Sequence, residues 1–166
     1  MSKISYDTPR LSIVPLGLND ASFIQELVNT EGWLEFIGNR NIQNKTDAEA
    51  YIDKIRANPN TDYWTVFLKE PAIPIGIITF IKRDYLQFPD LGFAFLPQQA
   101  NQGYAYEAAS AMLNELIKGR EKIQAVTSKE NQKSIKLLQK LNFKPEGEIK
   151  DQTASLLLFG YTPVIE

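Results

Sequence analysis

The sequence from Asp90 to Ala108 reads DLGFAFLPQQANQGYAYEA, an apolar and aromatic run followed by a short polar loop and an alanine-rich segment. We expect a strand that ends at Pro97 and a helix from Gly103 to Lys118. The first N–H groups of a helix have no partner within it and carry about half a positive charge, so they can bind an anion. Gly103 would let a phosphate approach this backbone, although a lone glycine is more simply explained by a tight turn.

The helix after this loop has the strongest helical pattern in the chain. Its apolar residues recur every three or four positions, as on one buried face. They are Ala105, Ala108, Ala109, Met112, Leu113, Leu116 and Ile117. Gly119 stands where helices commonly end in a left-handed conformation.

The segments around this strand and helix alternate between the two kinds of structure. Further strands are predicted over residues 11–16, 63–68, 75–83, 122–127, 143–149 and 155–162. Further helices are predicted after Asn19 or Asp20, from a Thr46–Glu49 capping box, and after Asn131, with a short helical piece within 30–45. The order β-α-α-β-β-β-α-β-α-β-β implies a mixed α/β fold, mostly antiparallel, with helices on both faces.

Length and composition favour one domain over residues 1–166, with residues 1–9 as a polar N-terminal lead. The chain has no cysteine and no histidine, which excludes thiolate chemistry, imidazole-based triads and most zinc sites, so no metal is expected. A net charge of −2 argues against a nucleic-acid partner. No stretch is apolar enough for a membrane span or a secretion signal, so we expect a cytoplasmic protein; a homodimer is left open.

Three segments, taken in order and spacing, resemble the GCN5-related N-acetyltransferase (GNAT) family, in particular its ribosomal-protein-acetylating type. They are Lys82-Arg83-Asp84 through Asp90 to Pro97, Gly103 to Ala108, and Asn131 to Phe143. The resemblance extends from about Arg10 to Tyr161 and implies acetyl-CoA as donor and a primary amine as acceptor. It also implies that acetyl-CoA is bound by Phe95, Leu96, Gln102, Gly103, Tyr104, Ala105, Asn131 and Lys133.

The expected phosphate loop departs from the family pattern. The family usually has Gln, Arg or Trp three residues before the retained glycine, then another glycine, then often Lys or Arg. Here these positions hold Ala100, Asn101 and Gln102, and no Lys or Arg lies between Pro97 and Ser110. We therefore expect that CoA binds more weakly, or that a basic group from elsewhere in the chain compensates for the missing Lys or Arg. One candidate group, equally well explained as a solvated helix face, is Lys129, Lys133, Lys136 and Lys140.

Acetyl transfer to an amine needs a base for the amine and an acid for the leaving thiolate. Many family members place a tyrosine acid seven residues after the equivalent of Asn131, but this position is Leu138. Ser134 matches a serine that lies near the CoA sulfur in the ribosomal-protein-acetylating branch, although first-turn hydroxyls often simply bond a backbone N–H. Asp90 is the candidate base, near where other branches keep a strand glutamate.

Four residues are candidates for the acceptor side: Glu31, Trp33, Phe36 and Tyr85. Glu31 and Glu35 flank Trp33 in the region that closes over the acceptor in the family, but surface charge and core packing explain such residues more simply. Glu107 lies in the first turn of a predicted helix, where a negative charge is favourable, so we expect it to have a structural role rather than a catalytic one.

The acceptor itself stays open between protein N-termini, polyamines, aminoglycosides and amino acids. The alternative function is that of a catalytically silent domain that binds acyl-CoA or has a regulatory role. Its motivation is the altered loop at Ala100 to Gln102 together with Leu138.

Overall fold

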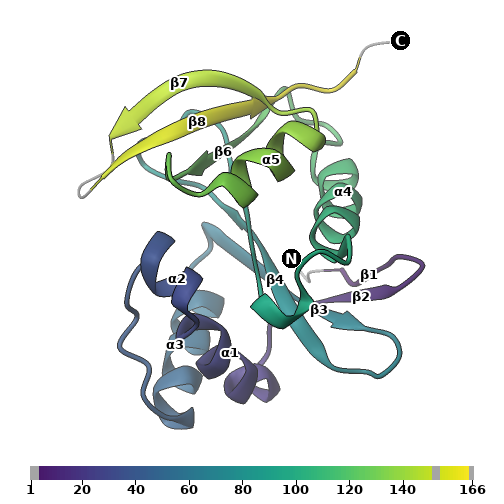
Figure 1. Ribbon diagram of the computed structural model, residues 1–166, viewed down its shortest axis with the longest axis vertical. Helices are drawn as coiled ribbons and strands as arrows, with labels where there is room; N and C mark the ends of the chain where they lie inside the picture. Colours follow the sequence, from purple (N-terminus) through teal and green to yellow (C-terminus); the bar gives the residue numbers. More distant parts are fainter. Residues whose placement is uncertain (1–3, 151–153, 165–166) are drawn as a thin grey trace.

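The computed structural model describes residues 4–150 and 154–164, so both ends of the predicted 1–166 domain lie outside the described residues. Its eight strands form one sheet in the order β1-β2-β3-β4-β5-β6-β8-β7 (Figure 1). The strands are β1 (Tyr6–Asp7), β2 (Leu11–Pro15), β3 (Thr61–Leu68), β4 (Pro74–Ile81), β5 (Asp90–Phe95), β6 (Ile123–Thr127), β7 (Lys144–Lys150) and β8 (Ser155–Tyr161). Of the pairs described, β5 with β6 is parallel and the others are antiparallel, which confirms the predicted mixed, mostly antiparallel sheet.

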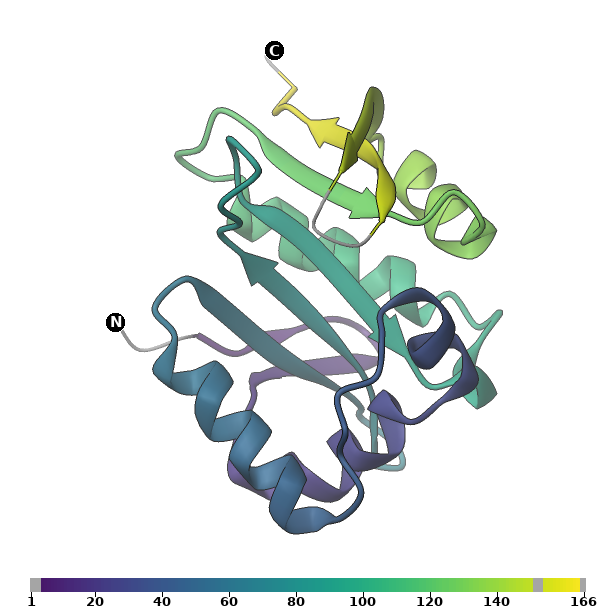
Figure 2. The same cartoon turned by 90° about the vertical axis from the view of Figure 1, so that its left-hand side faces the viewer.

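Helices cover both faces of this sheet, as predicted. They are α1 (Ala21–Val28), α2 (Glu31–Phe36), α3 (Lys45–Ala57), α4 (Tyr104–Leu116) and α5 (Gln132–Lys140), with 3-10 turns η1 (Leu18–Asp20) and η2 (Pro97–Gln99). Figure 2 shows α1 and α3 in front of the sheet and α4 behind it. None of these helices has the length and apolar character needed to span a bilayer, within the residues described.

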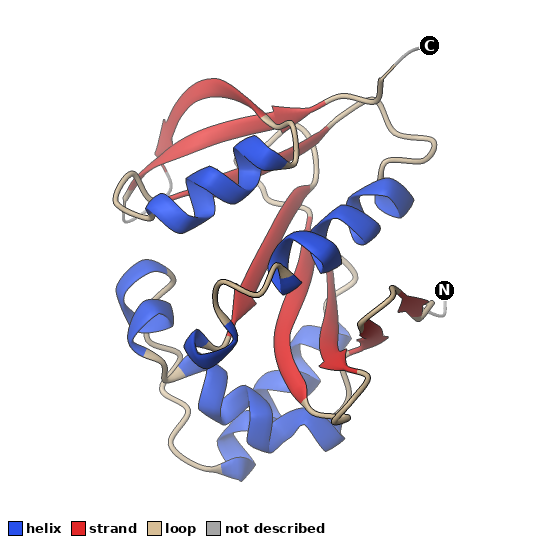
Figure 3. Ribbon diagram, turned by 45° about the vertical axis from the view of Figure 1, so that its right-hand side comes forward, coloured by secondary structure: helices blue, strands red, loops and turns tan. Residues whose placement is uncertain are grey.

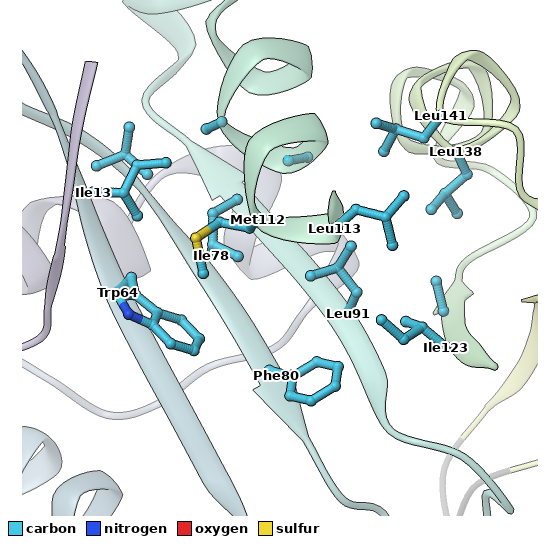
Figure 4. Close-up of a cluster of buried hydrophobic side chains, with 14 of the residues drawn as sticks. Ile13, Trp64, Ile78, Phe80, Leu91, Met112, Leu113, Ile123, Leu138 and Leu141 are labelled. Carbon is cyan, nitrogen blue, oxygen red and sulfur yellow. The ribbon is translucent and has the colours of Figure 1, made fainter. Parts of the chain in front are cut away.

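Two apolar clusters hold the helices against the sheet. On one face α4 buries Met112 and Leu113 against the sheet, and α5 adds Leu138 and Leu141 (Figure 4). On the other face α1, α2 and α3 pack around Ile77 and Leu96. Burying one such large side chain contributes roughly 1.5–3 kcal/mol to stability. These buried faces therefore hold the helices in place against the sheet.

Several helix ends agree with the sequence patterns. The Asn131 side chain accepts a hydrogen bond from the Ser134 N–H at 3.2 Å, which confirms it as the N-cap of α5. Gly119 and Asn142 both have left-handed backbones, with φ of 73° and 69°.

One predicted end is wrong. Asn44, not Thr46, caps α3, because its side chain accepts from the Asp47 N–H at 2.8 Å. Asp20 is the N-cap residue of α1, one of the two predicted positions, but its carboxylate makes no cap hydrogen bond and accepts instead from Gly17 N–H at 3.0 Å and Thr65 Oγ1 at 2.9 Å. Strand β1, which was not predicted, lies within the polar lead and pairs with β2.

Candidate active site

The parallel strands β5 and β6 separate almost as soon as they meet. One register pair, Asp90 with Gln124, joins them, whereas β5 pairs with β4 along its whole length. In Figure 2 the two strands start side by side and then point apart. The end of β5 beyond Leu91 is only partly buried although the strand is central in the sheet. We call this divergence the β5–β6 splay.

The splay leaves one edge of β5 unpaired. Backbone groups of successive strand residues face opposite neighbours. Leu96 N–H bonds Ile75 on the β4 side at 2.9 Å, so the groups of Phe93 and Phe95 face β6. No strand of the described chain pairs with them there. An extended ligand that carries amides can add to such an edge as a strand would.

Two helices begin beside the splay, after the carboxyl ends of β5 and β6. Ligands of open α/β sheets commonly bind at such a position. Asn131 caps α5, but α4 begins at Gly103 with no side-chain cap (Figure 3 shows the loop that leads from η2 to α4). The N–H groups at the start of α4 are therefore the ones available to an anion.

The loop before α4 has two left-handed residues, Asn101 with φ 63° and Gly103 with φ 80°. Asparagine is one of the few residues other than glycine that adopts this conformation readily. Asn101 therefore adopts a conformation that glycine also adopts readily. The asparagine at position 101 is thus compatible with a left-handed turn in this loop.

Sequence reasoning missed a cation at this loop, the guanidinium of Arg10. Its Nη1 donates to the Gln102 carbonyl at 2.9 Å, its Nε donates to Glu107 at 2.7 Å, and it lies 4.5 Å from the Tyr104 ring centre. These contacts join residues more than 90 positions apart, which no local pattern reveals. A pocket of about 620 Å³ adjoins Arg10 and Gly103 and extends to Lys140.

Glu107 is a structural residue, as the sequence indicated. Its carboxylate accepts from the Thr8 hydroxyl at 2.5 Å and from the Arg10 N–H at 3.0 Å, in addition to the Arg10 side chain. Burial alone would raise the pKa of Glu107, but the hydrogen bonds from Thr8 and Arg10 together hold it below its usual value. Glu107 therefore fastens the start of β2 to α4.

The four lysines do not form the single helical stripe that was predicted. Lys129 precedes α5 and its ammonium pairs with Glu148 at 2.8 Å. Lys140 lies over the Tyr106 ring, 4.2 Å from its centre. Lys133 and Lys136 are exposed on α5.

Asp90 lies where the pairing of β5 and β6 ends. The residue is 4% exposed. Its carboxyl group accepts from Arg83 Nε at 3.0 Å and also from the Val126 N–H on β6. Burial raises the pKa of Asp90, and the Arg83 ion pair and the Val126 N–H oppose this without cancelling it. Tyr85 lies close enough to Arg83 to favour its charge. Asp90 thus combines a structural contact across the splay with the raised pKa that a base needs.

Tyr63 of β3 is a further polar group here that sequence reasoning did not select. Burial, and then the neighbouring Tyr51 hydroxyl, raise the pKa of Tyr63, while Arg83 and Arg40 act in the opposite direction. The Tyr63 hydroxyl therefore stays protonated at neutral pH and can donate a hydrogen bond.

Of the acceptor candidates on α2, Trp33 is a core residue whose one polar group is buried. It is 5% exposed, and its Nε1 has no hydrogen-bond partner among the described residues. Phe36 is half-buried, whereas Glu31 and Glu35 are exposed. No described contact joins either carboxylate to Asp90 or Ser134.

At the start of α5, Ser134 is half-buried. Leu138, at the position of the missing tyrosine, is 1% exposed and belongs to the core cluster. An apolar core side chain therefore stands where many family members have the tyrosine acid. Over the described part of the chain, no three carboxylate side chains are grouped to hold a metal ion.

Comparisons with known proteins identify this architecture. Residues 10–144 match the acetyltransferase (GNAT) domain family. A curated relative, the uncharacterized N-acetyltransferase YnaD of Bacillus subtilis, is 28% identical over 145 residues, which cover 86% of this chain and 84% of the relative.

Solved structures share the fold at lower identity. A GNAT-family acetyltransferase from Bacillus anthracis is 22% identical with a TM-score of 0.81, covering 96% of this chain and 98% of the other. Ribosomal-protein-S5-alanine acetyltransferase from Vibrio fischeri is 18% identical with a TM-score of 0.80, covering 96% and 97%.

Proposed function

Because this chain belongs to the GNAT acetyltransferase family, we propose that it transfers acetyl groups at the β5–β6 splay, with the open start of α4 as its phosphate site. The chain is an acetyl-CoA-dependent N-acetyltransferase that acts on amines. The observation that carries the location is the pairing of β5 with β6 at Asp90 alone, beside an uncapped helix.

The residues at the splay fit acetyl-CoA in two respects. The unpaired edge at Phe93 and Phe95 offers N–H and C=O groups to the amides of an extended pantetheine. The uncapped turn at Gly103, Tyr104 and Ala105 offers backbone donors to a diphosphate. We propose that Leu96, Gln102, Asn131 and Lys133 complete the binding of acetyl-CoA. When bound, acetyl-CoA supplies the acetyl group as an activated thioester.

The acid and base functions are divided between the two sides of the splay. Asp90, with its raised pKa, takes the proton of the acceptor ammonium, either directly or through water. Ser134, at the first turn of α5, donates a hydrogen bond toward the leaving sulfur. The silent alternative is not favoured, because the chain matches the acetyltransferase domain over residues 10–144 and a curated N-acetyltransferase over 86% of its length.

The acceptor enters from the sheet face that α2 shares with Asp90. Phe36, Tyr85 and the exposed Glu31 are our candidates for contact with the acceptor, whereas Trp33 is buried in the core cluster beside them. We propose a protein N-terminus or a small-molecule amine as acceptor, in the cytoplasm. The Vibrio fischeri structure, a ribosomal-protein acetyltransferase, supports the first of these.

Addition of acetyl-CoA should raise the melting temperature of the protein. A ligand that binds only the folded state stabilises it by about 2.7 kcal/mol at a hundredfold excess over its dissociation constant. Differential scanning fluorimetry with and without millimolar acetyl-CoA measures this shift. A melting temperature that does not move under these conditions would contradict the proposed phosphate site.

Ser134→Ala should lower kcat only modestly, by less than about tenfold. A thiolate with a pKa near about 8.5 is a stable leaving group, so it needs little help from an acid. Thiol release at saturating acetyl-CoA measures the effect. A loss of about 10² or more with unchanged acetyl-CoA binding would show full general-acid catalysis, and no loss would reduce Ser134 to a structural hydroxyl.

A further inference from the structure

The phosphate loop lacks its own cation, and an arginine from the first strands lies against it. Family members often carry Lys or Arg just before the retained glycine, where this chain has Gln102. The Arg10 guanidinium donates to the carbonyl oxygen of that same residue at 2.9 Å. A β-carbon added to Gly103 would lie 3.3 Å from Arg10 Nη2, so the guanidinium also closes over Gly103.

This hydrogen bond orients the donor next to it. The Gln102 carbonyl and the Gly103 N–H belong to one planar trans peptide and point in opposite directions. Because Arg10 holds the carbonyl, the Gly103 N–H points away from Arg10. A hydrogen bond to the carbonyl also polarises the peptide and strengthens its N–H as a donor.

Glu107 holds the guanidinium in this position. It binds both the Nε and the main chain of Arg10, and the Tyr104 ring stacks beneath the charge. The Glu107 side chain is 19% exposed, whereas that of Arg10 is 46% exposed. Since Glu107 neutralises much of the charge of Arg10, the arginine acts on the loop by position more than as a free cation.

We propose that Arg10 is a positioning residue for acetyl-CoA: it fixes the Gln102–Gly103 peptide so that the start of α4 binds the diphosphate without a loop cation. This inference rests on the proposed phosphate site at Gly103. It concerns how that site is held in shape, and it assigns Arg10 no contact with the acetyl group.

A comparison of two acetyl donors tests the proposal. S-Acetylpantetheine carries the same thioester and amides as acetyl-CoA but no diphosphate. S-Acetylpantetheine also lacks the 3′-phosphoadenosine that the diphosphate carries. The ratio of kcat/KM for acetyl-CoA to that for S-acetylpantetheine therefore reports recognition of the diphosphate together with this nucleotide part, and the change that an Arg10 variant makes in it measures the effect of Arg10 on that recognition. Taken within one preparation, this ratio does not depend on the folded fraction. We expect Arg10→Ala to lower it about tenfold, as for a charge-assisted hydrogen bond that is partly exposed.

Two further variants complete the test. Arg10→Lys keeps the charge but cannot reach Gln102 and Glu107 together, so it should recover part of the loss. Lys118→Ala removes a cation from the other end of α4, where it pairs with Glu115 at 3.0 Å, and should leave the ratio unchanged.

The outcomes separate this inference from the proposed function. A wild-type ratio near one would mean that the diphosphate adds nothing to recognition, and the proposed phosphate site would fail first. A high wild-type ratio that Arg10→Ala and Arg10→Lys leave unchanged would overturn the role of Arg10 alone. A lower melting temperature with an unchanged ratio gives Arg10 a merely structural role and also overturns the proposal.

Discussion

Gly103→Val should abolish the stabilisation of the protein by acetyl-CoA. Gly103 has φ 80°, a conformation that costs a β-branched residue about 1–2 kcal/mol, and its added side chain would meet Arg10. The valine would also displace the guanidinium that holds the Gln102 carbonyl, and would thereby disturb the Gly103 N–H that faces the diphosphate. At a concentration where wild type gains about 2.7 kcal/mol from the ligand, the variant should gain almost none. Calorimetric titration and thermal melts measure both quantities.

Gly119→Val is the matched control for this prediction. Gly119 lies at the opposite end of α4 with φ 73°, and a β-carbon there would have open space around it. The control carries the same backbone strain without blocking the start of the helix, so it should lower stability and keep the full acetyl-CoA response. An equal loss of response in both variants would mean that strain, and not the phosphate site, explains the result.

Asp90→Asn should lower kcat/KM by about 10² to 10⁴, as expected for the loss of a general base. The base must be ionised to accept a proton, so wild-type kcat/KM should rise with pH through the raised pKa of Asp90. The variant should lack this acidic limb. If water carries the proton instead, the variant keeps most of its activity and the limb follows the pKa of each amine in a series.

The same pKa predicts how Asp90 affects stability. In the folded protein the pKa of Asp90 is raised above the unfolded-state value of about 3.9. The contribution of Asp90 to the free energy of unfolding is therefore fully present below the unfolded-state pKa, and it is lost as the pH rises through the folded-state pKa. Asp90→Asn should remove this pH dependence. Glu146→Gln is the control for the loss of an ion pair, because it changes a carboxylate that pairs with Lys122. This variant should keep the acidic limb of the kcat/KM profile.

Much of the fold follows from local sequence patterns. The alanine-rich helix and the loop before it were placed within about two residues, because helical periodicity and Gly119 are local signals. Asn131 was identified as the start of a helix for the same reason. Thr46 was wrong as a cap because Asn44, two residues earlier, offers an equally suitable side chain, and local sequence does not rank the two.

The missing parts of the site depend on contacts between distant residues. Arg10 and Glu107 are 97 positions apart, and Asp90 bonds a backbone N–H on the next strand of the sheet. Such pairs exist only once the sheet order is fixed. The left-handed turn at Asn101 was predictable in principle from the tolerance of asparagine for that conformation, but it reads as an altered glycine until its φ of 63° is known.

A crystal structure of the protein with acetyl-CoA would locate the diphosphate and the thioester together and so test the proposed site. We expect the diphosphate on the N–H groups of Gly103, Tyr104 and Ala105, the pantetheine amides along the β5 edge at Phe93 and Phe95, and the thioester between Asp90 and Ser134. A diphosphate bound away from the start of α4, or a thioester out of reach of both side chains, would contradict it.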